Sequence, residues 1–139
     1  MSIENNDIMN LIQSAIKAKK FSYAPYSNFN VGAALLTKDN KIFTGCNIES
    51  ASFSATVCAE RTAFFNAISQ DEKNFKAIAI VGSKNTSPIK NFCPPCGICR
   101  QVMTEFCNDD FLIILFDGKS YKQLKLSELM PFTFGYSNI

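Results

Sequence analysis

This chain is constrained above all by two short cysteine motifs, Cys58-Ala-Glu-Arg61 and Pro94-Pro-Cys-Gly-Ile-Cys99. The sequence contains no histidine, so a bound metal ion must be held by sulfur or carboxylate. A structural zinc site uses four protein ligands, whereas a hydrolytic site leaves one position for water and needs a proton carrier beside it. Three cysteines close to Glu60 match the hydrolytic pattern.

The residues that follow Cys58 each allow two interpretations. Glu60 could exchange protons with water at the metal, or it could only complement the dipole at a helix start. Its position beside a ligand cysteine favours the catalytic interpretation. Arg61 could donate hydrogen bonds to the ligand sulfurs, or it could be a solvated surface arginine, and spacing alone does not decide between them.

Cys93 adds a second possible ligand set. Together with Cys58, Cys96 and Cys99 it could form a closed four-cysteine structural site that has no catalytic role. The two prolines at 94 and 95 make it harder for Cys93 to turn toward such a site. The other two cysteines, Cys46 and Cys107, are typical of buried thiols in a strand and a helix.

The composition predicts one folded domain over residues 1–139. The chain is 47% hydrophobic, and its 14 basic and 12 acidic residues form no block of one sign. This balance argues against nucleic acid as a partner and favours a small uncharged ligand. The apolar run 111–116 is too short to span a membrane, and the polar N-terminal segment is unlike a secretory signal. We therefore expect a cytoplasmic protein whose thiols bind metal instead of forming disulfides.

Apolar spacing and turn residues define the expected elements. Two helices should begin at the cysteine motifs, with Cys58 in the first turn of one of them, so that thiolates lie at the positive ends of the helix dipoles. The order of elements predicts an α/β fold with a mixed sheet and helices on both faces. The expected helices cover 8–20, 58–68, 96–106 and 126–130, the expected strands cover 31–36, 41–46, 75–81, 111–117 and 120–125, and 83–91 is expected to be a polar loop.

Four parts of the chain resemble a known family: the two cysteine motifs and the segments Tyr23–Leu36 and Gly45–Glu49. Over nearly its whole length the chain resembles the short, homotetrameric, zinc-dependent cytidine deaminases. The resemblance implies a three-layer α/β/α fold with a mixed five-stranded sheet. It also implies hydrolysis of cytidine and 2′-deoxycytidine to uridine and 2′-deoxyuridine, with release of ammonia, in pyrimidine salvage.

The same resemblance implies roles for individual residues. Cys58, Cys96 and Cys99 would hold one zinc ion per subunit, Glu60 would move protons, and Arg61 would contact the ligand sulfurs. The substrate would be bound by the residues that match the family's nucleoside pocket, which are Phe29 and the Ala59 backbone at the base, Asn47 and Glu49 at the ribose, and Phe134 from a neighbouring subunit.

Some expectations stay open at this point. Phe132 could replace Phe134 over the neighbouring site, and the segment Ser50–Thr56 should lie at a subunit contact of the tetramer. One alternative activity is deamination of another small base-containing compound of the blasticidin S type, which the Asn47/Glu49 pair makes less attractive. The other alternative is the non-catalytic four-cysteine zinc module.

Overall fold

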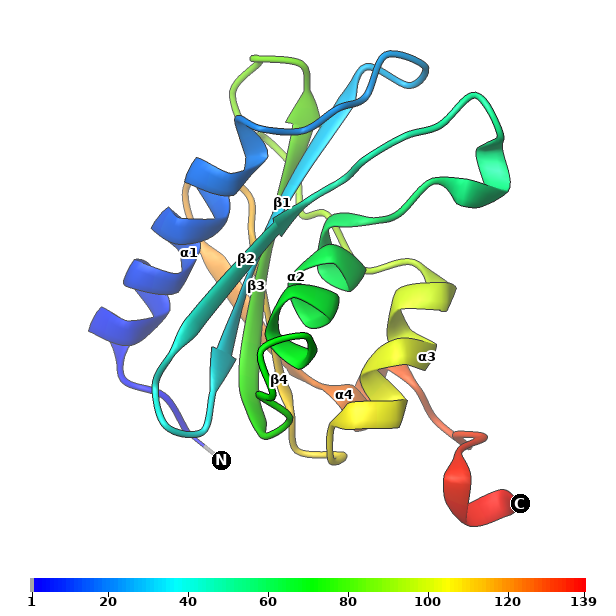
Figure 1. The fold of residues 1–139 in the computed structure, drawn as a ribbon. Coiled ribbons are helices and arrows are strands. Elements are labelled where there is room, and N and C mark those ends of the chain that lie inside the picture. The colour runs from blue at the N-terminus through cyan, green and yellow to red at the C-terminus, as the bar shows by residue number, and fades with distance from the viewer. Residues whose placement is uncertain (1) are drawn as a thin grey trace.

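Five strands form one mixed sheet in the computed structural model, which describes residues 2–139 (Figure 1). The strand order is β2-β1-β3-β4-β5, with β3 and β4 parallel and the other neighbouring pairs antiparallel. This arrangement confirms the predicted mixed five-stranded sheet. The strands are β1 (Phe29–Thr37), β2 (Ile42–Cys46), β3 (Phe75–Lys84), β4 (Leu112–Phe116) and β5 (Tyr121–Lys125).

Helices cover both faces of the sheet, as predicted (Figure 1). On one face lies α1 (Asn5–Lys19), whose stripe from Ile8 to Ala15 is buried against alternate residues of the central strands. On the other face lie α2 (Ala59–Ile68), α3 (Gly97–Phe106) and α4 (Leu126–Leu129). Phe64 of α2 is fully buried in this second core. Because both faces are covered, the central strands are apolar on both sides.

The pairing of β1 with β3 extends both strands beyond their predicted ends. Phe29, which precedes the expected strand 31–36, is the first residue of β1, and it pairs with Lys84. The prediction of a loop from Ser83 was therefore wrong at its start, since β3 continues to Lys84. A polar segment forms a strand here because a neighbouring strand satisfies its backbone groups.

A glycine in β2 places the helix that carries Cys58. A Cβ atom at Gly45 would lie 2.5 Å from the carbonyl oxygen of Ala59 and 2.4 Å from the backbone nitrogen of Ala63. These distances are well inside van der Waals contact, so only glycine lets α2 lie directly on β2. The close approach brings the start of α2 to the end of β2, where Asn47 follows.

The C-terminal segment extends away from the sheet and ends in the short 3-10 helix Tyr136–Asn138 (Figure 1). Its contact with α3 includes a hydrogen bond of 2.9 Å from Gln101 Nε2 to the carbonyl oxygen of Phe134. The side chains of Phe132, Phe134 and Tyr136 are exposed. None of the helices formed by residues 2–139 is long and apolar enough to cross a membrane.

Candidate metal centre and active site

Two helix starts meet at the candidate metal centre. Cys58 is the N-cap of α2, and Cys96 is the N-cap of α3, each with an extended backbone (ψ 155° and 168°). The prediction that Cys58 lies in the first turn was wrong by one residue, because the helical hydrogen-bonding pattern begins after the cap. The cap position still holds each sulfur near the unpaired amides and the positive end of the helix dipole, which favour thiolate.

The sulfurs of Cys58, Cys96 and Cys99 form a compact cluster. Cys58 Sγ lies 3.6 Å from Cys96 Sγ, which lies 3.4 Å from Cys99 Sγ, and all three atoms are within 4.8 Å of one another. Sulfurs that bind one tetrahedral zinc ion at about 2.3 Å are separated by about 3.8 Å, whereas a disulfide bond measures only about 2.05 Å. The spacing and the thiol chemistry of the cluster therefore fit one zinc ion.

The local charges favour ionisation of the cluster, beginning at Cys58. A hydrogen bond from the Cys99 thiol, assisted by Arg61, outweighs burial and lowers the pKa of Cys58 to about 5. The same hydrogen bond, together with burial, raises the pKa of Cys99. Arg61 Nη2 lies 3.4 Å from Cys58 Sγ, so the arginine contacts a sulfur of the cluster and is not a solvated surface residue. Its positive charge offsets part of the negative charge that three thiolates would carry.

Glu60 is a buried carboxylic acid in the first turn of α2, next to this cluster. Its side chain is only 4% exposed. Burial is the main reason that the pKa of Glu60 is raised to about 7, and the nearby charge of Cys58 adds to the effect. A carboxyl group that titrates near neutrality can both accept and donate a proton, which is what general acid–base catalysis requires.

A cavity of about 310 Å³ connects the thiol cluster with the expected substrate residues. It brings together Phe29, Asn47, Glu49 and Ala59, which come from different parts of the chain, next to Glu60. Phe132 and Phe134 do not line it, so a chain does not place its own C-terminal phenylalanines in this cavity. The complete lining is Ser27, Phe29, Val31, Asn47, Glu49, Thr56, Cys58, Ala59, Glu60, Cys93, Pro94 and Cys96.

Asn47 and Glu49 also organise the loop that forms one wall of the cavity. The Asn47 amide donates to the carbonyl oxygen of Phe29 at 2.8 Å and accepts from the backbone nitrogen of Val31 at 2.9 Å. Glu49 Oε1 accepts from the backbone nitrogens of Tyr26 and Ser27, and the Ser27 hydroxyl donates to Glu49 Oε2. The hydroxyl of Ser27 is the main reason that the pKa of Glu49 is lowered.

Comparison with known proteins agrees with this geometry. The model of the cytidine and deoxycytidylate deaminase zinc-binding region matches residues 5–115. The chain belongs to this deaminase family. It is thus a hydrolytic deaminase with a zinc-binding region, and the cluster of Cys58, Cys96 and Cys99 could bind one zinc ion.

Individual relatives support the same assignment. The cytidine deaminase of Sporosarcina psychrophila is 42% identical over 134 residues, which cover 96% of this chain and 95% of the relative. The crystal structure of cytidine deaminase from Burkholderia pseudomallei has a TM-score of 0.82 at 40% identity and covers 95% of this chain and 100% of its own. It confirms the predicted α/β/α deaminase fold. The blasticidin-S deaminase of Bacillus cereus is 33% identical over 105 residues, covering 73% of this chain and 74% of the relative.

Cys93 lies in the wall of the deaminase cavity but outside the thiol cluster. A Cβ atom at Gly82 of β3 would lie only 2.8 Å from Cys93 Sγ, so this sulfur packs directly on the strand. Burial raises the pKa of Cys93 to about 12, so the thiol stays protonated, whereas zinc binds the thiolate. The metal-ligand cluster found among residues 2–139 contains Cys58, Cys96 and Cys99 and not Cys93. This geometry favours the three-cysteine site over the four-cysteine module.

The variant Cys93→Ser tests which of these two ligand sets is correct. We expect about one zinc ion per chain and a nearly unchanged melting temperature, because the three-thiol site is left intact. Zinc content by atomic emission and thermal unfolding would measure both quantities. Loss of zinc together with loss of the fold would contradict the three-cysteine assignment and support the closed four-cysteine site.

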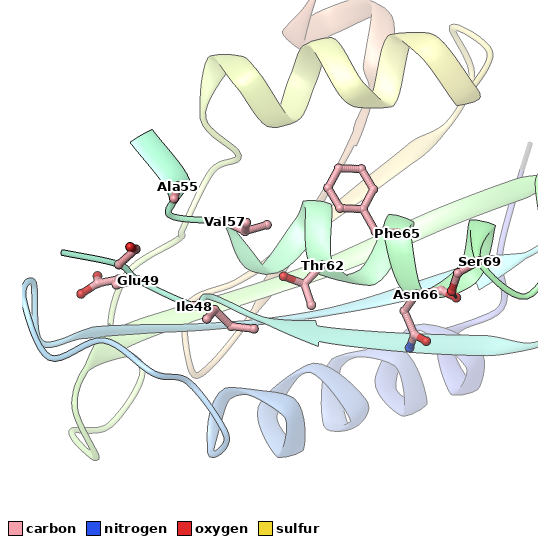
Figure 2. Close-up of a pocket in the computed structure, with 9 residues that line it drawn as sticks. Ile48, Glu49, Ala55, Val57, Thr62, Phe65, Asn66 and Ser69 are labelled. Atoms are coloured by element: carbon pink, nitrogen blue, oxygen red, sulfur yellow. Dashed lines mark hydrogen bonds between the residues drawn. The ribbon is translucent and has the colours of Figure 1, made fainter. Parts of the chain in front are cut away.

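A second hollow, of about 540 Å³, lies on the outer side of α2 in this deaminase (Figure 2). Figure 2 shows Thr62, Phe65 and Asn66 along α2, beside Ile48 from the segment after β2. Glu49 lines both this hollow and the cavity with the thiol cluster. The two hollows are therefore neighbours that share a side chain, and the outer one is largely apolar.

Proposed function

We propose that this deaminase converts cytidine and 2′-deoxycytidine to uridine and 2′-deoxyuridine by hydrolysis, with release of ammonia. The observation that carries the proposal is the buried Glu60 beside three clustered thiols, in one cavity with an aromatic ring and a polar pair. A flat pyrimidine ring can contact Phe29, and a sugar hydroxyl can contact Asn47 and Glu49.

The chemistry can be assigned to the residues around Glu60. Cys58, Cys96 and Cys99 would hold zinc, which supplies a nucleophile at neutral pH by lowering the pKa of water. Glu60 accepts a proton from the attacking water at its carboxylate and delivers it to N3 of the cytosine ring. It then accepts the proton of the new hydroxyl on C4 and delivers that proton to the departing amine, which leaves as ammonia. Burial raises the pKa of Glu60 to about 7, so the proton can move in both directions near neutral pH. The positive charge of Arg61 partly neutralises the negative charge of the sulfurs.

The polar pair has enough free hydrogen-bonding capacity for one sugar hydroxyl. The Asn47 side chain donates one N–H to Phe29 and accepts at one lone pair of its oxygen from Val31. One N–H and one lone pair of the amide remain free for a ligand. Glu49 accepts three hydrogen bonds from Tyr26 and Ser27, which leaves one lone-pair position on Oε2. One hydroxyl can thus both donate to Glu49 and accept from Asn47, and the Ala59 backbone lies in the same cavity for the base.

A direct assay separates this function from its alternative, blasticidin S deamination. Purified protein is mixed with cytidine, with 2′-deoxycytidine or with blasticidin S, and the ultraviolet band of the cytosine ring is followed. We expect turnover of both nucleosides, because the sugar-binding pair is present and the matched cytidine deaminase is the more similar relative. Turnover of blasticidin S alone would assign the site to the other compound.

We also propose that the active form is a homotetramer in which neighbouring subunits meet at the active sites. The support is the apolar hollow of Figure 2, which adjoins the catalytic cavity through Glu49 and is lined by the exposed ring of Phe65. Phe53, in the segment after Glu49, is also exposed. The segment Ser50–Thr56 borders this hollow. Six free cysteines suit a reducing compartment, which supports a role in cytoplasmic pyrimidine salvage.

Phe134→Ala tests whether the C-terminal segment completes a neighbouring site. Phe134 is 63% exposed in the single chain and does not line its own cavity. If it covers the partner's nucleoside, its loss should raise KM for cytidine about tenfold, because a buried aromatic contact is removed. Kinetics and light scattering would be measured, with a mass of about four chains of 15.4 kDa expected. Phe21→Ala, at an exposed position after α1, is the matched control, and Phe132→Ala tests the alternative residue. An unchanged KM for Phe134→Ala would contradict this placement.

A further inference from the structure

A serine that the sequence motifs did not single out connects the two substrate-binding parts of the cavity. We propose that Ser27 is a positioning residue for nucleoside binding, which holds the aromatic ring of Phe29 and the carboxylate of Glu49 in one arrangement. This inference rests on the proposed function, in which Phe29 contacts the base and Glu49 the sugar. Ser27 itself lines the cavity.

Ser27 forms hydrogen bonds to both Glu49 and Phe29. Its hydroxyl donates to Glu49 Oε2 and accepts from the backbone nitrogen of Phe29 at 3.0 Å. Its backbone nitrogen donates to Glu49 Oε1 at 3.1 Å. Asn28, between Ser27 and Phe29, has a left-handed backbone with φ 56°, which turns the chain so that one hydroxyl reaches both neighbours.

The other contacts of Phe29 involve its carbonyl oxygen and its ring, not its backbone nitrogen. Asn47 holds its carbonyl oxygen, and the ring rests on β3, where a Cβ atom at Gly82 would lie 2.9 Å from Phe29 Cε2. The ring is still 38% exposed, so it faces the cavity and is not locked in the core. Ser27 therefore supplies the link on the N-terminal side of Phe29, and it alone among these contacts joins Phe29 to Glu49.

The link through Ser27 should control substrate binding and not the chemical step. The thiol cluster and Glu60 lie at the starts of α2 and α3, and the hydrogen bonds of Ser27 within residues 2–139 go to Glu49 and Phe29. Loss of the Ser27 hydroxyl should loosen the ring and the carboxylate together, so that binding must order both groups. The chemical step that follows binding should be nearly unchanged. A rise in KM without a fall in kcat is the expected signature.

The test compares Ser27→Ala with Ser27→Thr, which keeps the hydroxyl, and with Ser14→Ala. Ser14 is a matched control on α1, where its hydroxyl bonds only within its own helix, to the carbonyl oxygen of Asn10. For Ser27→Ala we expect KM for cytidine and the inhibition constant for the product uridine to rise together by about five- to tenfold. We expect kcat within twofold of the unsubstituted protein, one zinc per chain and an unchanged melting temperature. Ser27→Thr should recover most of the binding.

The outcomes separate this inference from the proposed function. If the unsubstituted protein turns over cytidine but Ser27→Ala binds cytidine and uridine as Ser14→Ala does, the positioning role is wrong and the function stands. If kcat falls and KM does not, or if Ser27→Thr is as weak as Ser27→Ala, the link does not act through substrate binding. No turnover of either nucleoside by the unsubstituted protein would overturn the proposed function and this inference with it.

Discussion

Glu60→Gln is expected to lower kcat for cytidine by about a thousandfold or more, within the range that general acid–base groups contribute. Glutamine has nearly the same shape, but its amide neither accepts nor releases a proton at neutral pH. Glu60 is buried next to the thiol cluster, and in the variant the amide would occupy the same place. Because the three thiols remain, zinc content should stay near one ion per chain.

Steady-state kinetics and metal analysis on the same preparation would check both parts of this result. Glu105→Gln is the matched control, because Glu105 is an exposed glutamate on α3. It should behave as the unsubstituted protein. Near-normal turnover by Glu60→Gln would show that the proton carrier is another group, and loss of zinc would show that Glu60 is itself a ligand.

Cys99→Ala is expected to abolish both zinc binding and activity. Cys99 is buried in the cluster, and removing its sulfur leaves two protein ligands where a catalytic zinc site needs three. Zinc that binds only the folded chain also stabilises it, so the melting temperature should fall as well. Activity should drop to the background of the assay, a loss of at least about a thousandfold if zinc supplies the nucleophile.

The control for this second variant is Cys46→Ala. Cys46 is a partly buried free cysteine at the end of β2, outside the cluster. Its loss should leave zinc content and kcat close to normal. Zinc would be measured after dialysis, and activity before and after zinc is added back. A Cys99→Ala protein that keeps one tightly bound zinc ion and its turnover would show that the cluster is not the metal site.

Much of the fold could be predicted because its signals are local. The stripe from Ile8 to Ala15 predicted α1, and the apolar segments 31–36 and 41–46 predicted strands β1 and β2, which pair across a turn with Asn40 in the left-handed region. Element ends were less certain. The one-residue shift at Cys58 and the extension of β3 to Lys84 both depend on hydrogen bonds to other parts of the chain, which periodicity does not report.

The residue types and their spacing already indicated the chemistry of the candidate site. Without histidine, metal binding must rely on sulfur or carboxylate, and the short spacings Cys58-x-Glu60 and Cys96-x-x-Cys99 keep the groups within each motif close together. Two features depend on the folded arrangement of the chain: Cys93 packs on Gly82 instead of joining the cluster, and Ser27 donates a hydrogen bond to Glu49. The physical reason is that both contacts join segments that are far apart in the sequence. Strand pairing and the close approach of α2 to β2 bring these segments together, so the distances between their side chains depend on tertiary packing.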